Sequence, residues 1–324
     1  MKRRDMDRPA SPKISVCIPT YNYAHYITDA IKSACAQTFT DIEILVLDDC
    51  STDNTCEIVS QLAKADSRIA YIQNASRRGF VGNFTRCIEA AAGEYVKILC
   101  ADDLLTAACL EKMVKVLDEN ENVSLVSCSR QLADGSLNKI EALSYPARTS
   151  VLPGAEVIRK CLFSGNLIGE PTAVLFRKRD ALRGFNAGYS LLVDLEMWFY
   201  LLEKGDLFCL PDILCTIRRH EGQATYDCVK TLSFVDDIEK LYQEFIRKPY
   251  MHYTFLSSLK KRLGMTFIVW SQRTVINDPE MVRQKIGRFM NYYLALIVMP
   301  LYLAIIKTNE FIRTYARVAS CMVR

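Results

Sequence analysis

The sequence predicts an α/β domain with a mostly parallel sheet and helices on both of its faces, followed by a helical C-terminal region. Half of the 324 residues are apolar and 24% are charged, so the chain can bury a full α/β core. From Ile14 to Cys128, short β-rich apolar runs alternate with longer runs of helical period, which is typical of βαβ units around a parallel sheet. Beyond Tyr226 the pattern is helical.

Apolar runs predict the strands in the first part of the chain. They are Ile14–Ile18, Ile42–Leu47, Ile69–Ile72, Tyr95–Leu99 and Leu125–Cys128. Helices are expected between them, since Tyr26–Gln37 and Phe80–Ala91 each place apolar residues on one helical face. Later elements are expected as a helix near Ala155–Phe163, a strand around Thr172–Phe176, a helix at Asp194–Lys204 and a strand near Ile213–Arg218.

Two segments leave more than one interpretation open. Periodicity is lost between Ser129 and Pro153, which favours either a mobile substrate loop or an extra hairpin. Tyr292–Ile306 is apolar for fifteen residues and contains Pro300, but it is shorter than the roughly 20 residues of a membrane-spanning helix. It is compatible with a helix in the membrane interface, a pair of short helices kinked at the proline, or a buried core helix.

We therefore expect four regions along the chain. Residues 1–12 form a flexible tail, 13–222 the α/β domain, 223–285 a helical extension and 286–324 an apolar helical segment close to a membrane. The first residues, MKRRDMDRPASPK, lack the apolar run of a secretory signal. This end is expected to stay in the cytosol, either solvated or touching anionic lipid.

Charge and cysteine usage argue against two classes of protein. The net charge of +4 is spread over 41 basic and 37 acidic residues without a long run of one sign, which argues against a nucleic-acid-binding groove. The 13 cysteines are odd in number and no pair has CxxC spacing, so neither a disulfide framework nor a thiolate zinc site is predicted. A reducing cytosol is the natural compartment for such a chain.

The ends of the first two strands carry residues that suit a nucleoside. Ligands of open α/β sheets collect beyond the carboxyl ends of the strands, where a turn fixed by Pro19 can present Tyr21 to an aromatic base. Packing is the simpler role for that tyrosine. The second strand ends in an acidic pair that includes Asp49, and such a carboxylate can accept the ring N–H of a uracil-like base. Asp53 or Asn54 is expected to cap the helix that follows.

A second acidic pair, Asp102 and Asp103, follows the fourth strand directly after Cys100 and Ala101. Hard carboxylate oxygens at that edge suit Mg²⁺ or Mn²⁺ carrying a diphosphate, because such ions keep several waters and need only one or two protein ligands. A turn stabilised by aspartate side chains is the simpler alternative. Since two acidic pairs converge on one edge, we favour the metal site.

The chain resembles the family 2 glycosyltransferases of the GT-A type in segments that occur in the expected order, which are ISVCIPTYN, QTFTDIEILVLDDCSTDNT, GEYVKILCADDLL and VDLEMW. The resemblance covers about Ile14–His220 and implies a GT-A, Rossmann-like fold that takes a nucleoside diphosphate sugar. The QxxRW motif of processive synthases is absent, which favours the addition of a single sugar per encounter.

The resemblance also assigns roles at the sheet edge. It implies that Thr20, Tyr21 and Asp49 hold the nucleoside, and that Asp102 and Asp103 occupy the metal and diphosphate position. The family often has aspartate where this chain has the cysteine before that pair. Which carboxylate ligates the ion directly is therefore open.

The segment Ala75–Asn83 matches the turn that runs under the nucleotide in this family, with Arg77, Arg78 and Asn83 as the expected contacts. A guanidinium group can donate two parallel hydrogen bonds to phosphate oxygens. The alternative is a solvated basic loop.

The remaining assignments concern the acceptor side. Asp194 matches the acidic position that serves as general base in the family, and Glu196 is the second choice. Trp198 follows one helical turn along on the same face, where it can wall the acceptor site. His220 resembles a histidine near the diphosphate in relatives, where it could stabilise the leaving group, although a surface position is the alternative.

These assignments predict an inverting transferase of polysaccharide synthesis, in which the base takes the proton of an acceptor hydroxyl while the sugar leaves a nucleoside diphosphate. We expect this diphosphate to be UDP. The acceptor is expected to be a glycan or a lipid-linked glycan at the inner face of the cell membrane, contacted peripherally through the C-terminal segment. Two rivals stay open. An inert nucleotide-sugar-binding membrane adaptor is suggested by Cys100 and Val193, where the family often has acidic residues, and a Rossmann oxidoreductase is disfavoured because no GxGxxG follows the first strand.

Overall fold

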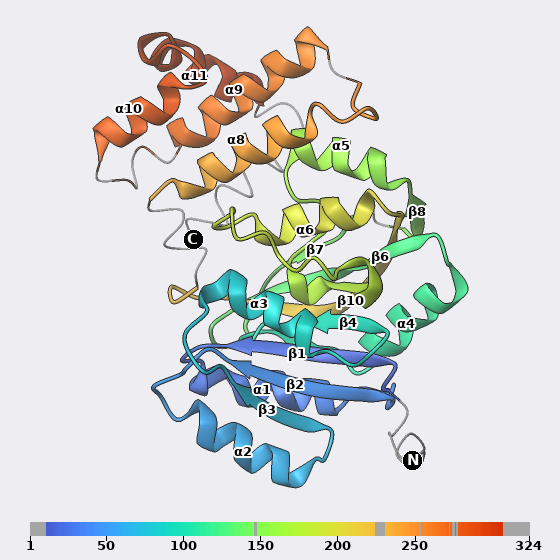
Figure 1. The fold of residues 1–324 in the computed structure, drawn as a ribbon. Helices are drawn as coiled ribbons and strands as arrows, with labels where there is room; N and C mark the ends of the chain where they lie inside the picture. The colour runs from blue at the N-terminus through green and yellow to red at the C-terminus, as the bar shows by residue number, and fades with distance from the viewer. Residues whose placement is uncertain are drawn as a thin grey trace, which may run out of the picture. The chain divides into compact units, whose positions relative to one another are not determined.

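The computed structural model describes residues 11–145, 148–223, 231–252, 254–271, 273, 276 and 278–306. The chain divides into two compact units. The first contains Met1–Val157, Ile168–Ala187 and Val193–His220, and the second contains Ile158–Leu167, Gly188–Leu192 and Glu221–Arg324. A large sheet with its helices makes up the first unit, whereas helices dominate the second (Figure 1).

A ten-stranded sheet forms the core of the first unit. Its strands are β1 (Ile14–Thr20), β2 (Ile42–Asp48), β3 (Ile69–Gln73), β4 (Tyr95–Ile98), β5 (Leu104–Leu105), β6 (Val123–Asp134), β7 (Lys139–Leu143), β8 (Ser150–Leu152), β9 (Val174–Arg177) and β10 (Asp206–Arg219). Their order is β3-β2-β1-β4-β9-β6-β10-β5, with β7 beside β6 and β8 beside β10. Strands β1 to β4, β6 and β10 share one direction, which confirms the prediction of a mostly parallel sheet.

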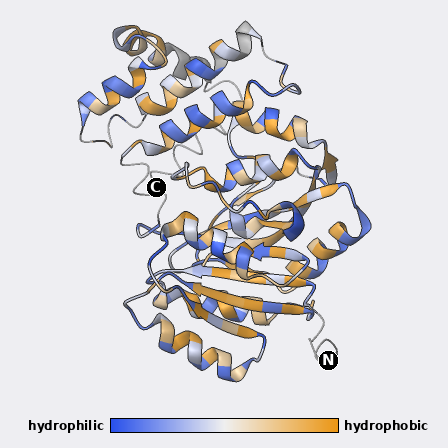
Figure 2. Ribbon diagram, in the orientation of Figure 1, coloured by the Kyte–Doolittle hydropathy of each residue, from blue (hydrophilic) through white to orange (hydrophobic). Residues whose placement is uncertain are grey.

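Every residue of β1 and nearly every residue of β2 is buried. Strands that are buried in this way are covered on both faces of the sheet, as in other α/β proteins. The apolar character of these central strands is visible in Figure 2. The helices of the first unit are α1 (Ala24–Cys35), α2 (Thr55–Ala65), α3 (Gly79–Ala90), α4 (Cys109–Glu119) and α6 (Val193–Leu202), with short 3₁₀ turns η1 (Pro171–Ala173) and η2 (Lys178–Asp180). Helix α5 (Gly154–Ser164) begins in the first unit and ends in the second. The helices predicted at Tyr26–Gln37 and Phe80–Ala91 are confirmed as α1 and α3, each beginning slightly earlier.

The order of the strands creates a switch point between β1 and β4. The chain passes from β1 through α1 to β2, and then through α2 to β3, on one side of β1. It then crosses back through α3 to β4, which pairs with the other side of β1 in parallel. Successive crossovers in opposite directions leave a crevice beyond the carboxyl ends of the two strands, where ligands of open α/β sheets bind.

The described residues of Ser129–Pro153 do not form the mobile loop that we considered. Strand β6 continues to Asp134, and β7 folds back on it in antiparallel register. Asp134 closes the turn between them by accepting hydrogen bonds from the backbone amides of Ser136 and Asn138. The alternative prediction of an extra hairpin is therefore confirmed.

The second unit contains α8 (Ser233–Phe245), α9 (Phe255–Ser271), α10 (Pro279–Gly287) and α11 (Tyr292–Ile306). A buried apolar cluster holds these helices together, with Phe234, Val269, Ile286, Ala295 and Met299 among its members. The helical pattern read from the sequence beyond Tyr226 is thus confirmed for the described residues.

Helix α11 spans the whole of Tyr292–Ile306 with Pro300 inside it. Ala295 and Met299 are fully buried, whereas Tyr293, Leu294, Leu296 and Ile297 are exposed, which makes one side of the helix core and the other an apolar surface. Within the described part of the chain, no helix has both the length and the apolar character that crossing a membrane requires.

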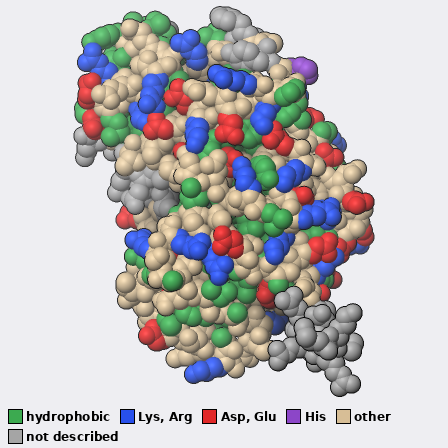
Figure 3. Space-filling view, viewed as in Figure 1, with side chains coloured by type: hydrophobic (Ala, Val, Ile, Leu, Met, Phe, Trp, Pro, Cys, Tyr) green, Lys and Arg blue, Asp and Glu red, His purple; other side chains and the backbone are tan. Residues whose placement is uncertain are grey.

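Surface charges are paired locally. Lys13 contacts both Glu94 and Asp118 at 2.8 Å, and Lys285 contacts Asp236 at 2.6 Å. Basic and acidic side chains alternate over the face drawn in Figure 3. Such exposed ion pairs add little to the stability of the fold. Because basic and acidic side chains are mixed on this face, it has no extended region of positive or negative electrostatic potential.

The packing of β1 against β4 makes a first prediction. Gly93 precedes β4, and a Cβ there would lie 2.6 Å from the Ser15 nitrogen and 2.8 Å from the Ile14 carbonyl carbon. Because these atoms belong to the backbone of β1 and cannot move aside, Gly93→Ala should lower the free energy of unfolding of the first unit by about 1–3 kcal/mol. Urea unfolding followed by circular dichroism measures the change.

The matched control is Gly264→Ala in α9, where a Cβ would meet nothing within 4 Å. Alanine is the better helix former, so this variant should be neutral or more stable by roughly 0.5–1 kcal/mol. A wild-type unfolding curve for Gly93→Ala would contradict the close approach of the two strands.

Candidate active site

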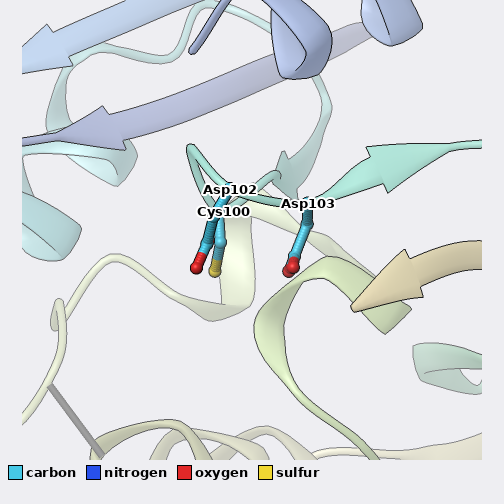
Figure 4. A group of neighbouring side chains, drawn as sticks. All are labelled: Cys100, Asp102 and Asp103. Carbon is cyan, nitrogen blue, oxygen red and sulfur yellow. The ribbon is translucent and has the colours of Figure 1, made fainter. Parts of the chain in front are cut away.

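The acidic pair lies in a tight turn that follows β4. The Asp103 amide donates to the Cys100 carbonyl at 3.0 Å, which closes the turn. The side chains of Cys100, Asp102 and Asp103 all leave the turn on the same side (Figure 4). The sulfur and one oxygen of each carboxylate lie within 4.8 Å of one another. The sequence motif therefore folds into one compact cluster of possible ligand atoms.

Buried partners fix both carboxylates. Asp103 is 2% exposed, and it accepts hydrogen bonds from the Thr172 hydroxyl at 2.6 Å and from the Arg218 amide at 2.9 Å. Asp102 is 6% exposed, and its Oδ2 lies 3.0 Å from Nε2 of His220. Burial, followed by the neighbouring charge of Asp102, raises the pKa of Asp103 well above its ordinary value. Two like charges this close are costly unless a cation compensates them.

The donor set fits a hard divalent cation. Carboxylate oxygens are the ligands that Mg²⁺ and Mn²⁺ prefer, and a site with two of them leaves coordination positions for water and a diphosphate. Outer partners such as Thr172 and His220 hold the carboxylates in position, as they do around most protein metal sites.

His220 lies in an aromatic surrounding as well as beside Asp102. Its ring centroid is 4.8 Å from that of Tyr26 and 5.9 Å from that of Tyr23, both near the start of α1. The guanidinium of Arg218 lies 4.4 Å from the Tyr26 ring centroid. The expected position of this histidine near the acidic pair is therefore compatible with the geometry, and its side chain is largely buried rather than a free surface group.

The end of β1 presents an aromatic ring and a buried hydroxyl. The Arg77 guanidinium stacks 3.8 Å from the centroid of the Tyr21 ring, so one face of this ring already has a partner. Thr20 is 3% exposed, and its hydroxyl has no hydrogen-bond partner among the described residues. The Thr20 carbonyl accepts from the Asp49 amide at 2.9 Å, which ties the ends of β1 and β2 together.

Asp49 is held by the loop that leads into α3. Its Oδ1 accepts from the Arg78 amide at 2.7 Å and from the Asn74 side chain at 3.0 Å, and its Oδ2 accepts from the Gly79 amide at 2.8 Å. Since each carboxylate oxygen has two lone pairs, Oδ2 retains room for one more donor. Gly79 has φ of +73°, a left-handed conformation that glycine adopts without strain.

Asn83 supports this loop. Its side chain is 4% exposed, donates to the Leu47 carbonyl at 2.9 Å and accepts from Asn74 at 3.0 Å. These two bonds hold α3 to β2, and the contact of Asn83 with the nucleotide stays a prediction.

The predicted cap of α2 is Asp53. Its Oδ1 accepts from the Thr55 amide at 3.1 Å, and its Oδ2 accepts from the Ala24 amide at 3.0 Å, so one carboxylate serves the first turns of two helices. Asn54 makes no side-chain capping bond. This result confirms the structural interpretation of Asp53 over a ligand-binding one.

Asp194 lies in the first turn of α6 and is half-buried. Its Oδ1 accepts a hydrogen bond from the Leu195 amide at 2.7 Å. Burial raises the pKa of Asp194 to about 7, and the charge of Glu170 adds to the effect. Burial also raises the pKa of the Cys100 thiol, with contributions from Asp103, Asp102 and Asp194. The predicted base therefore lies close enough to the acidic turn for their charges to interact.

Glu196 and Trp198 do not have the surroundings that we expected. Glu196 is fully buried and forms a bidentate ion pair with Arg183, with both N···O distances at 2.8 Å. Trp198 is also fully buried, and its Nε1 donates to the Gly169 carbonyl at 3.1 Å. The prediction that Trp198 walls the acceptor site is wrong, and Glu196 has no access to a substrate proton.

Sequence reasoning missed an ion-pair chain beside Asp194. Glu170 lies 2.5 Å from Nε of Arg130 and 2.8 Å from a terminal nitrogen of Arg219. Burial alone would raise the pKa of Glu170, but the charges of Arg130 and Arg219 outweigh it and hold that pKa below its ordinary value. The basic pair directly before His220 was the available signal for Arg219, whereas nothing in the pattern pointed to Glu170 or Arg130.

Comparison with known sequences agrees with this geometry. The family described as "Glycosyl transferase family 2" matches residues 15–182, which is 168 of the 324 residues. An uncharacterized glycosyltransferase of Bacillus subtilis, EpsJ, is 32% identical over 297 residues that cover 87% of this chain and 84% of the relative. The "GalNAc(5)-diNAcBac-PP-undecaprenol beta-1,3-glucosyltransferase" of Campylobacter jejuni is 36% identical over 129 residues, which cover 40% of this chain and 41% of the relative.

Solved structures share the fold at low sequence identity. Residues 1–349 of S. aureus TarS, in complex with UDP-GlcNAc, superpose with a TM-score of 0.58 at 15% identity, covering 85% of this chain and 90% of that one. The mannosyltransferase PcManGT of Pyrobaculum calidifontis, in complex with GDP-Man and Mn²⁺, gives a TM-score of 0.60 at 19% identity, covering 97% and 85%. Since the family match spans more than half of the chain, this protein belongs to glycosyl transferase family 2 and is a glycosyltransferase of the GT-A fold.

Proposed function

We propose that this enzyme transfers one sugar from a UDP-sugar to a hydroxyl of a glycan or lipid-linked glycan, with inversion at the anomeric carbon. The observation that carries the proposal is a carboxylate base with a pKa of about 7, Asp194, near the acidic pair of the β4 turn. A one-step displacement needs a proton acceptor on one side of the anomeric carbon and compensation of leaving-group charge on the other.

Each residue has a distinct role in this mechanism. Asp194 accepts the proton of the attacking hydroxyl, since a base with a pKa near the working pH is both ionised and basic enough. Asp102 and Asp103 would hold a divalent cation, Mn²⁺ or Mg²⁺, which offsets the charge of the departing diphosphate when bound. His220 orients Asp102 through the contact between Nε2 and Oδ2.

The nucleoside would lie over the ends of β1 and β2. Pro19 and Thr20 are the last two residues of β1 instead of the turn that we expected, and Tyr21 follows them directly. The open face of the Tyr21 ring can stack on a base. Asp49 accepts the ring N–H of the base at the remaining lone pair of Oδ2. Arg77 lies beside Tyr21, within reach of the nucleotide. The UDP-GlcNAc complex of TarS supports a uridine donor, although PcManGT binds GDP-Man.

A lipid-linked acceptor is supported by the C. jejuni relative, whose name specifies an undecaprenol-linked substrate. Such an acceptor is presented at a membrane, and α11 offers an apolar side with Tyr293, Leu294 and Ile297 exposed. Arg283 lies 5.9 Å from the Tyr293 ring, and a basic group beside an apolar helix face suits anionic headgroups. We therefore place the enzyme in peripheral contact with the inner face of the cell membrane, in the synthesis of a surface polysaccharide.

The cation site makes a second prediction. Asp102→Asn and Asp103→Asn keep the size of each side chain but remove its charge, so each should weaken Mn²⁺-dependent binding of UDP by about 10–100-fold or more, because disturbing even an outer partner of a metal ligand has that effect. Calorimetry with and without Mn²⁺ measures the affinity. Asp41→Asn is the control with no expected effect on the binding of UDP, because Asp41 directly precedes β2 and lies at the amino ends of the parallel strands. Unchanged affinity and Mn²⁺ dependence in both test variants would contradict the cation site.

The stacking of a base on Tyr21, directly after β1, makes a third prediction. Tyr21→Ala should weaken the binding of UDP by about 1–3 kcal/mol, the usual range for a base on an aromatic ring. Tyr21→Phe retains the ring and should bind almost as the wild type does. The stacking role is excluded if calorimetry finds no difference between the alanine and phenylalanine variants.

The base makes a fourth prediction. Asp194→Asn keeps the hydrogen bond to the Leu195 amide but lacks the basic lone pair, so kcat should fall by about 10²–10⁴-fold while donor affinity stays nearly unchanged. In the wild type the ionised form is active, and the pKa is raised to about 7, so kcat should fall as pH decreases through 7 and level off above it. Initial rates across the pH range measure both effects.

Glu196→Gln is the comparison variant. It breaks the buried ion pair with Arg183 and should lower thermal stability, but it should leave the pH dependence of kcat in place. Near-normal turnover of Asp194→Asn would show that Asp194 only caps its helix, since asparagine is an equally good cap.

A further inference from the structure

Cys100 occupies the same small cluster as the two carboxylates. Its sulfur lies within 4.8 Å of an oxygen of Asp102 and of an oxygen of Asp103. Figure 4 shows the sulfur of Cys100 and the carboxylate of Asp102 side by side on one side of the turn. Metal-ligand distances of about 2.3 Å for sulfur and about 2.0–2.2 Å for oxygen allow one ion to contact three atoms spaced in this way.

The backbone and Thr172 hold the three side chains in place. The Cys100 amide donates to the Thr172 hydroxyl at 3.1 Å, and that hydroxyl donates to Asp103 at 2.6 Å. The Asp103 amide closes the turn on the Cys100 carbonyl. The side chain at position 100 is therefore fixed relative to the carboxylates by the same contacts that orient a metal ligand.

The surroundings of Cys100 differ from those of the other cysteines of the sheet. Cys17, Cys128, Cys209 and Cys215 lie inside strands and are buried as small apolar side chains. Cys100 is partly exposed and lies next to buried acidic groups, where an apolar side chain has no packing advantage. A thiol in this position is better explained by what it can bind than by packing.

We propose that Cys100 is a third protein ligand of the divalent cation, so that the site presents one sulfur and two carboxylates and prefers Mn²⁺ or softer ions to Mg²⁺. The inference rests on the cation site proposed above and deepens it. Binding forms a bond between the sulfur and the metal, and the thiol proton leaves to solvent. Thiolate suits borderline and soft ions such as Co²⁺, Zn²⁺ and Cd²⁺, whereas Mg²⁺ favours an octahedral shell of oxygens and releases its water reluctantly.

The experiment is a Co²⁺ titration of the full chain followed by absorption spectroscopy. A bond between thiolate and Co²⁺ adds a charge-transfer band in the near ultraviolet, whereas ligation by carboxylates alone gives none. We expect the band in the wild type and in Cys35→Ser, a control at the far end of α1. Cys100→Ser and Cys100→Asp should lack it. The aspartate variant supplies an oxygen ligand in place of sulfur, and circular dichroism of both variants checks the fold.

A second measurement compares affinities by calorimetry. The ratio of Cd²⁺ to Mg²⁺ affinity should fall by about tenfold or more in Cys100→Asp, since even outer partners of metal ligands change affinity by about that factor. Mg²⁺ should still bind to this variant, because its site has three carboxylates.

Three results would overturn the proposal. Binding of Co²⁺ to the wild type without the band would exclude Cys100 as a ligand and leave the cation site intact. A band that survives in Cys100→Asp would assign the sulfur to another cysteine. Failure of the folded wild type to bind any divalent cation, with or without UDP, would overturn both this inference and the cation site.

Discussion

The repulsion between two adjacent buried carboxylates is the constraint on which the site depends. Asp102 and Asp103 lie almost out of contact with solvent, and burial together with their mutual charge keeps the pKa of Asp103 high. A chain that folds for stability alone gains nothing from such a pair. In the mechanism that we propose, a cation that carries the diphosphate would supply the missing opposite charge, so binding of the donor would also relieve this repulsion.

The strand order of the first unit positions this pair of carboxylates. The crossover from β3 to β4 brings the acidic turn beside the end of β1, next to Tyr21. The end of β10 reaches the same turn, because the amide of Arg218 in β10 and the ring of His220, directly after β10, contact the two carboxylates. Segments that are distant in sequence, the turn after β4 and the end of β10, therefore determine one charged cluster.

The sequence was sufficient to predict what depends on local pattern. Alternating apolar runs identified the strands of the parallel part, and the carboxyl-edge rule brought Asp49 and Asp102 to the correct edge. It was insufficient where a helix is buried on nearly all sides. In α6, almost every residue is buried, so helical spacing cannot tell that Trp198 and Glu196 face the core while Asp194 is half-exposed. Likewise, the antiparallel pairing of β9 depends on long-range contacts that periodicity does not encode.

The central claim is that this chain uses a bound cation to transfer a sugar from a nucleoside diphosphate. The most direct test incubates the full chain with a panel of UDP- and GDP-sugars and measures release of the nucleoside diphosphate, with Mn²⁺ present and after chelation. Our account predicts release from at least one UDP-sugar, loss of that release on chelation and recovery when Mn²⁺ is restored. Release that is unaffected by chelation, or no release and no binding for any donor in the panel, would contradict it.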